Sequence, residues 1–463
     1  MSRLPADPAD ALVDELTPLM RSAVDELQVT AVLESRGVTD AGAKEKYGYA
    51  DVFALGAEVF RRLPARPDHE PATVDRKRHQ ALREVAHGPL YVLPSAVYPA
   101  VFLLLGSQSM VRGMVFATAL GWVWGMGTSW VAYRLLARDM ERAAGRALRT
   151  LGGIGLLVAS TGAGALAWYT GAGPELVVFA VAQLSFQLAA GVLVFYGMEV
   201  RLALALLPAC AAGLFHLTTG FAPALAGPVV LAGLLSAALT VGIACWATFH
   251  AVQRPDPARR ADIRGEVRTA LPSAGYAALC AALILFTDAR YLTGALDLAL
   301  GAAPLVLSMG VLEWRTRRFF EQAADVLREV TRPAEFERRV RQVLLRELTR
   351  CLLALGAVAL SVMAVLAGFG VLTSRGALIA DAHVLLGGAF FAGLVLTVQQ
   401  RFAVLTGVLS VVLLADVVLT TALAESLSPN GEVPIFLCAT ATLAVSLLAA
   451  VHSSVGEVRR YRW

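Results

Sequence analysis

The sequence predicts an all-α polytopic membrane protein with twelve transmembrane helices in two parallel six-helix repeats, plus a small helical cytoplasmic module at the N-terminus. Three observations predict this fold class. Long apolar runs fill most of the chain after residue 88. Arginine gathers in alternate connecting segments, and the octapeptide that begins the first apolar run returns, nearly unchanged, about 180 residues later.

The composition is that of a membrane protein. The 463 residues are 57% hydrophobic and 16% charged, with a mean hydropathy of +0.62, whereas a soluble protein carries about 25% charged residues. The polar first 88 residues contain no secretory signal, nucleotide loop, metalloprotease motif or nucleophile elbow. All five cysteines lie in apolar runs without CxxC spacing, so we expect no disulfide, metal or cofactor. We also expect no nucleic-acid partner.

The predicted spans follow from length. A helix rises about 1.5 Å per residue, so about 20 apolar residues cross a 30 Å hydrocarbon core. The runs lie near 89–106, 112–136, 150–170, 175–198, 201–220 and 227–250, then 270–292, 297–314, 350–372, 378–399, 402–423 and 433–452. The predicted domains are 1–86 (N-terminal module), 87–252 (first lobe), 253–269 (basic linker), 270–455 (second lobe, with a cytoplasmic amphipathic segment at 315–349) and 456–463 (tail).

Basic residues set the predicted orientation. Clusters of Arg and Lys lie at 76–83, 138–149, 254–268, 315–350 and 459–462. The segments on the other side hold only Arg112, Arg290 and Arg375. Because cytoplasmic loops carry an excess of basic residues, we expect both termini in the cytoplasm of a multi-pass protein in the inner (plasma) membrane. The arginine-rich stretch from Glu313 to Arg350 is predicted to bend at Arg332-Pro333 and to lie on anionic headgroups.

The repeated octapeptide predicts the internal symmetry. "LPSAVYPA" begins at Leu93 and "LPSAGYAA" at Leu271, so that Pro94 matches Pro272 and Tyr98 matches Tyr276. Each copy opens the first span of a six-span half, and because six is even the halves are expected to be parallel. Gly127 and Gly310 are each followed seven residues later by an arginine, Arg134 and Arg317. Coincidence, with proline marking a helix start, is the alternative reading.

Ionisable residues inside spans are costly and usually face a cavity or each other. Asp288, Asp381 and Asp416 are candidate cation or proton ligands, with His383 as a relay. Asp416 is the deepest, about 14 residues or roughly 20 Å into its span, and Asp288 is its candidate neighbour. Gln183 and Gln187 are one turn apart and should share a polar face. His216 and Arg290 could also line a cavity, although His216, Arg290 and Asp381 could instead contact headgroups.

The stretch "VRTALPSAGYAALCAALILFTDARYLTG" (Val267 to Gly294) resembles the seventh span of the multidrug/oligosaccharidyl-lipid/polysaccharide (MOP) exporter superfamily. The resemblance rests on Arg268, Leu271-Pro272, the small residues 273–275 and Asp288. The six-plus-six layout is similar to the polysaccharide-flippase-like branch, although that branch often has fourteen spans. The resemblance implies two lobes around a cavity that alternates between leaflets, driven by a Na⁺ or H⁺ gradient.

The implied function is a flippase or exporter of lipid-linked oligosaccharide or polysaccharide precursors. A multidrug/cation antiporter and a non-transporting component of an envelope polysaccharide synthesis complex are the alternatives. A membrane glycosyltransferase is disfavoured, because the outer segments of about four to ten residues are too short for a catalytic site, and we expect no enzyme. The expected partners are membrane lipids, a lipid-linked glycan or amphipathic small-molecule cargo, and a cytoplasmic glycan-synthesis protein at residues 1–86.

Overall fold

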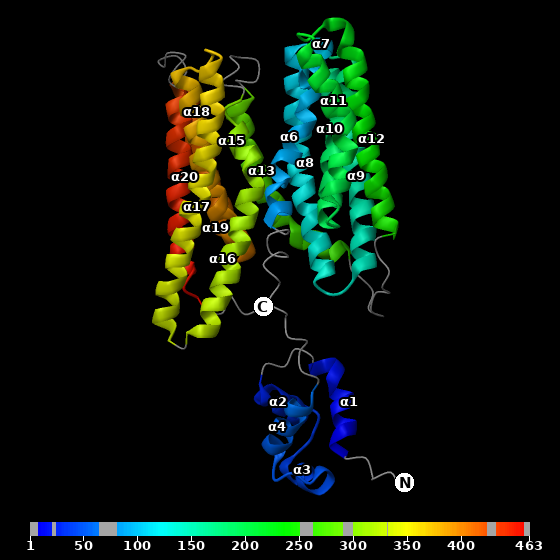
Figure 1. Cartoon of the computed structure of the whole chain (residues 1–463), viewed down its shortest axis with the longest axis vertical. Helices are drawn as coiled ribbons and strands as arrows, with labels where there is room; N and C mark the ends of the chain where they lie inside the picture. The colour runs from blue at the N-terminus through cyan, green and yellow to red at the C-terminus, as the bar shows by residue number, and fades with distance from the viewer. Residues whose placement is uncertain are drawn as a thin grey trace. The chain divides into compact units, whose positions relative to one another are not determined.

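The computed structural model describes residues 8–20, 25–63, 81–250, 263–289, 300–330, 332–423 and 432–457. Every regular element within these ranges is helical, which confirms the all-α class. The chain divides into two compact units, Met1–Gln80 and Ala81–Trp463, and Figure 1 shows the helices of each.

The N-terminal unit has its own core. Leu16, Leu33 and Leu55 are fully buried in it. Thr39 caps the helix that follows it, because its hydroxyl accepts a hydrogen bond from the Gly42 N–H at 3.2 Å. The helices are α1 (Pro8–Met20), α2 (Glu26–Ser35), α3 (Asp40–Tyr47) and α4 (Val52–Arg62).

The second unit contains two helical bundles, which we call the first and second lobes (Figure 1). The first lobe comprises α6 (His87–Val92), the 3₁₀ turn η1 (Leu93–Val97), α7 (Tyr98–Leu105), α8 (Ser107–Leu136), α9 (Glu141–Thr170), α10 (Pro174–Phe195), α11 (Glu199–Thr218), η2 (Pro223–Leu225) and α12 (Ala226–His250). The second comprises α13 (Ile263–Asp288), α15 (Ala303–Leu307), α16 (Met309–Glu329), α17 (Pro333–Gly368), α18 (Ser374–Val398), α19 (Phe402–Ala422) and α20 (Glu432–Ser454).

Ten helices in the described ranges are long and apolar enough to cross a membrane. Two segments that the sequence assigned to spans are not among them. α8 occupies the second predicted span as one continuous helix, but its sequence is rich in Gly, Ser and Thr and contains Arg112 and Arg134, so it is less apolar than the ten. The eighth predicted span falls on α15 and α16, which are separated by a break at Ser308, and α16 is rich in charge. Ten of the twelve expected spans are therefore supported by length and composition.

The two copies of the octapeptide adopt different backbones. The first copy breaks its span into α6, η1 and α7, whereas the second lies inside the continuous helix α13. The first copy carries two prolines, Pro94 and Pro99, each of which removes a helical hydrogen bond, and the second has only Pro272. One detail is shared: Ser95 donates to the Val92 carbonyl at 2.6 Å, and Ser273 donates to the Ala270 carbonyl at 2.8 Å.

Glycines bring the two lobes close together. Gly127 of α8 faces Ala274 of α13, with room for no more than a methyl group between them. Gly310 lies directly against the backbone carbonyl of Glu84, and Gly88 lies against that of Leu307. Contacts of this kind let helix backbones approach, as is usual in membrane bundles.

The arginine-rich segment is folded into the second lobe. α16 ends at Glu329 and α17 begins at Pro333, so the predicted bend at Arg332-Pro333 is confirmed. The apolar faces of the two helices are not free to lie on headgroups, because Phe319 and Phe336 are buried in the core of the lobe. The amphipathic pattern therefore reflects packing of α16 against α17 rather than a surface-lying helix.

Candidate functional site

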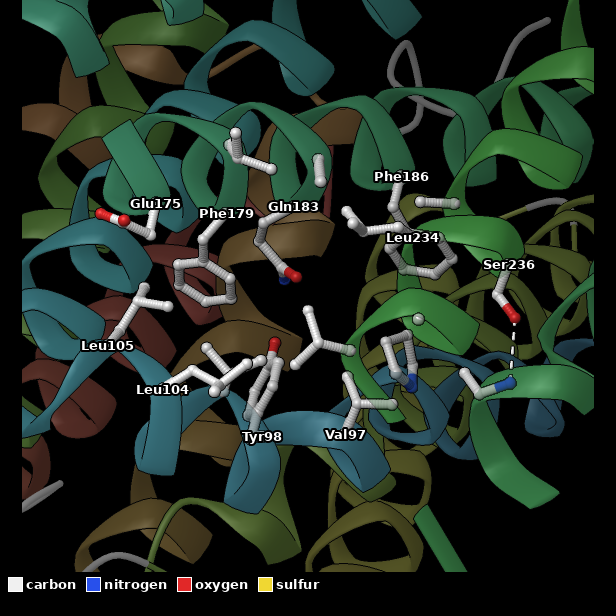
Figure 2. A pocket seen from close by; sticks show the side chains of 18 of the residues that line it. Val97, Tyr98, Leu104, Leu105, Glu175, Phe179, Gln183, Phe186, Leu234 and Ser236 are labelled. Atoms are coloured by element: carbon white, nitrogen blue, oxygen red, sulfur yellow. Dashed lines mark hydrogen bonds between the residues drawn. The ribbon is translucent and has the colours of Figure 1, made fainter. Parts of the chain in front are cut away.

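A cavity of about 310 Å³ lies inside the first lobe (Figure 2). Its walls are almost entirely apolar, and they come from η1, α7, α10, α11 and α12. The hydroxyl of Tyr98 and the amide of Gln183 point toward one another across it. Tyr98 also meets the edge of the Phe179 ring, with the two centroids 6.3 Å apart. The cavity thus offers a large apolar surface with one small polar spot at Tyr98 and Gln183, and the Glu175 carboxyl group is a further polar part of its lining.

Local sequence explains how this cavity forms. The break in the first span, between Pro94 and Pro99, places Tyr98 at the first turn of α7. Gly213 of α11 lies against the backbone carbonyl of Ala96, so α11 can approach the broken span closely. On the opposite wall the Ser236 hydroxyl accepts a hydrogen bond from the Ala209 N–H at 3.0 Å and joins α12 to α11 (Figure 2).

Gln183 and Gln187, one turn apart on α10, line two different cavities. Gln183 lines the first cavity, whereas Gln187 lines a second cavity of about 260 Å³ between α8, α9, α10 and α12. Its side-chain oxygen lies against Gly121 of α8. The matched residues of the second lobe also differ, since Tyr276 is buried in the core and Pro272 is exposed.

The structure brings two candidate residues together in the second lobe. His383 of α18 is fully buried, and its Nε2 lies 3.3 Å from Oδ2 of Asp288 at the end of α13. The other ring nitrogen, Nδ1, lies 2.8 Å from the carbonyl oxygen of Ile379 and must donate to it. A neutral ring would then present an acceptor nitrogen to the carboxylate. The contact is a hydrogen bond only when a proton resides on His383 or on Asp288.

The remaining candidates are placed separately. Asp416 is 2% exposed on the inward face of α19, a helix that packs against α13. Asp381 is exposed and points away from the lobe interior, so it does not join His383. His216 is buried against Phe221, and neither of its ring nitrogens has a hydrogen-bond partner among the described residues. Arg290 lies outside the described residues. Within those residues, no three His, Cys, Asp or Glu side chains form a metal-binding group.

The sequence analysis missed a set of ion pairs between the lobes. Arg134 and Arg138 of α8 pair with Glu266 of α13 at 2.8 and 2.5 Å, and Glu266 is only 8% exposed. Arg317 of α16 pairs in the same way with Glu84 of the first span. Arg134 and Arg317 had been noted in the sequence because each follows a glycine by seven residues. The sequence feature that could have identified their partners, Glu266 and Glu84, is an isolated acidic residue at the start of the first span of each lobe.

The buried histidine His87 forms a further contact between the two lobes. His87 Nδ1 lies 2.8 Å from Glu313 of α16, and its Nε2 lies 3.5 Å from Glu199 of α11. Arg83 completes the group through a 2.8 Å ion pair with Glu199. His87–Glu313 joins the two lobes, whereas the contacts of Glu199 with Arg83 and His87 lie within the first lobe. We call the His87–Glu313 contact, with the arginine–glutamate pairs above, the interlobe ion pairs. They hold the two lobes together at the arginine-rich end of the helices.

No protein-family model matches the chain, and no curated protein matches it in sequence. Its fold is similar to that of two solved structures. One is the crystal structure of MATE in the bent conformation, with 14% identity, a TM-score of 0.54, and coverage of 83% of this chain and 95% of that one. The other is the outward-facing conformation of a multidrug resistance MATE family transporter of the MOP superfamily, with 15% identity, a TM-score of 0.53, and coverage of 84% and 96%. The chain therefore has a MATE-like fold, in agreement with the superfamily resemblance.

Proposed function

We propose that this protein is a membrane transporter that exports small amphipathic molecules in exchange for protons. The observation that carries the proposal is the contact of buried His383 with half-buried Asp288, which is a hydrogen bond at 3.3 Å only when one of the two groups holds a proton. A site that holds one proton inside an apolar lobe can take it from one side of the membrane and release it to the other. The MATE-like fold and the first-lobe cavity support the transport half of the proposal.

The cargo that fits this cavity best is small and mostly apolar. A volume of about 310 Å³ lies at the lower end of ordinary ligand pockets, which range from about 300 to 1,000 Å³. Tyr98 and Gln183 offer two polar groups, and a sugar chain would need many more. We therefore favour a multidrug-type cargo over the lipid-linked glycan that the sequence resemblance implied.

Asp416 is proposed as a second proton or cation ligand. It is buried on a helix that packs against α13, the helix that carries Asp288. Charge within an apolar lobe is costly, so a carboxyl group there is held protonated, bound to a cation or paired.

We further propose that α8 and the α15–α16 segment complete twelve spans in two parallel repeats. Two features support this arrangement. Ser95 and Ser273 make the same hydrogen bond within the repeated motif. The ion pairs Arg134–Glu266 and Arg317–Glu84 relate the lobes reciprocally. Because arginine gathers in alternate connecting segments, we place the ion-paired end of the lobes on the cytoplasmic side of a plasma membrane. The N-terminal unit is proposed to bind a cytoplasmic partner.

The test is transport by the purified full-length protein in sealed liposomes. A fluorescent lipophilic cation is added, and its movement is recorded under an imposed proton gradient, under an imposed sodium gradient, and with neither. The proposal expects proton-driven movement that is absent from protein-free liposomes. Movement that is equal in all three conditions, or that follows sodium alone, would refute it. A fluorescent polyprenyl-pyrophosphate sugar tested in parallel would reveal a flippase instead.

A further inference from the structure

The second cavity of the first lobe, of about 260 Å³, opens sideways between α9 and α12. Gly153 of α9 and Cys245 of α12 line it and are both exposed, so the opening faces outward from the bundle. Ile154, which follows Gly153 in the chain, and Phe249, whose ring contacts Arg149, are large exposed apolar side chains. Because α9 and α12 are both long apolar helices, this opening faces the bilayer. We call it the lateral cleft.

Glycine shapes the interior of the lateral cleft. Gly125, Gly152 and Gly191 line it from three different helices, and at each a Cβ atom would meet no described atom within 4 Å. The space is therefore not filled by neighbouring side chains. Leu156, Leu188 and Val241 supply apolar walls of the kind that an acyl chain contacts.

A cationic group is fixed at one end of the cleft. Arg149 of α9 donates to the backbone carbonyl of Thr248 at 2.5 Å, and its guanidinium lies 3.9 Å from the Phe249 ring centroid. This contact uses one of the five guanidinium N–H donors, and the side chain remains partly exposed. Arg146 and Arg142 lie one and two turns nearer the start of α9 and do not line the cleft. The end of the cleft is therefore positively charged.

An unpaired donor lies inside the cleft. Thr128 of α8 is 7% exposed, and its hydroxyl has no hydrogen-bond partner among the described residues. Threonines on other helices of this lobe, such as Thr240, donate to a carbonyl of their own helix. A buried hydroxyl without a partner is rare in proteins, and this one lines the cavity.

We propose that the lateral cleft binds one anionic phospholipid from the leaflet at the arginine-rich end of the helices. Arg149 binds the phosphate group, the Thr128 hydroxyl donates to an ester carbonyl, and an acyl chain occupies the glycine-lined space. The sideways opening lets a lipid enter directly from the bilayer. This site is separate from the Tyr98 cavity and does not depend on the proposed cargo.

The test uses the full-length protein in nanodiscs of phosphatidylcholine that contain a trace of phosphatidylglycerol with a diazirine on one acyl chain. After irradiation, labelled peptides are mapped by mass spectrometry. We expect labelling to concentrate on the parts of α9, α10 and α12 that line the cleft. Gly152→Leu, which fills open space, should abolish it. Arg149→Gln should lower it about fivefold, equivalent to about 1 kcal/mol for one basic residue at an anionic surface.

Arg142→Gln is the matched control, because it removes an exposed arginine of the same helix that does not line the cleft. Because Arg142 lies away from the cleft, its loss should leave labelling of the cleft within about twofold of wild type. The proposal fails if the label spreads evenly over the exposed helices, or if Gly152→Leu leaves it unchanged. It also fails if a phosphatidylcholine probe labels the cleft equally well. If Arg149→Gln does not fold, Arg149→Lys and Gly152→Leu still decide the question.

Discussion

Arg134 of α8 and Glu266 of α13 form an ion pair at 2.8 Å that joins the first lobe to the second. Arg317 and Glu84 form its counterpart in the opposite direction, from the second lobe to the first. In each case the arginine follows a glycine by seven residues, and that glycine faces the other lobe. Close backbone packing and paired charge therefore occur at the same end of the protein.

Replacing Glu266 with Gln should destabilise this contact. The carboxylate is 8% exposed and accepts from both Arg134 and Arg138. Because the arginines are partly exposed, we expect a loss of about 1–3 kcal/mol rather than the larger cost of breaking a fully buried pair. Thermal unfolding in detergent measures it. Asp325→Asn is the control, since its pair with Arg328 is exposed and should contribute less than about 1 kcal/mol.

Asp288→Asn should abolish proton-driven transport. An amide cannot exchange a proton with His383, and the 3.3 Å contact becomes an ordinary hydrogen bond. Asp381→Asn is the matched control, because it is the same change at an exposed position near the start of α18. This variant should transport like wild type. Equal loss in both variants would mean that acidity at this end of the lobe matters, rather than the His383 pair.

Asp416→Asn should leave the protein folded and inserted but uncoupled from the gradient. The side chain is 2% exposed, and the substitution keeps its size while removing its charge. Transport in liposomes under a proton or a sodium gradient decides the matter. If the Asn variant transports like the wild type, Asp416 is a structural polar residue.

Gln183→Leu should alter cargo selection, because it removes half of the polar spot in the first cavity. We expect the KM for polar amphipathic cargo to rise about tenfold, the effect of losing one hydrogen bond of about 1.4 kcal/mol. Gln187→Leu, one turn away in the lateral cleft, should leave this KM unchanged. Equal shifts in the two variants would argue that the cargo does not occupy the first cavity.

Gly310→Ala should weaken the junction between α16 and the first span. A Cβ at this position would collide with the backbone carbonyl of Glu84, which cannot move aside as a flexible side chain could. Overpacking of this kind costs about 1–3 kcal/mol. Gly356→Ala on α17 has open space and should be neutral or slightly stabilising. The unfolding midpoints of the two variants, compared in one detergent, give the answer.

Much of the fold could be predicted, because a hydrocarbon core permits few backbone solutions. The predicted spans at 175–198 and 402–423 coincide closely with α10 and α19. The break in the first span could have been recognised from Pro99, since two prolines within one turn and a half remove two hydrogen bonds. The prediction for α8 rested on length rather than on its polar content.

The candidate site was less predictable, because it depends on contacts between distant residues. Asp288 and His383 stood out as ionisable residues in apolar spans, yet their pairing required the packing of α13 and α18. Asp381 has the same chemistry as Asp288 but faces the opposite way from His383, since the two are only two residues apart on a helix. Tyr98 was marked only as half of a repeated motif, and the cavity beside it comes from that motif's irregular backbone.

The first lobe contains the Tyr98 cavity, whereas the second contains Asp416, Asp288 and His383, the proposed proton-binding residues. In the proposed mechanism the cargo therefore binds to one lobe and the proton to the other, and this has a thermodynamic consequence. If cargo and proton occupy different lobes, their binding free energies can be linked only through the surface on which those lobes meet. Substitutions in that surface would leave the binding of cargo and of protons unchanged, but would raise the number of protons that cross for each cargo molecule exported. Variants of this kind, with normal cargo affinity but with proton movement that is not coupled to export, should lie on α8, on α13 and at the glycines between them.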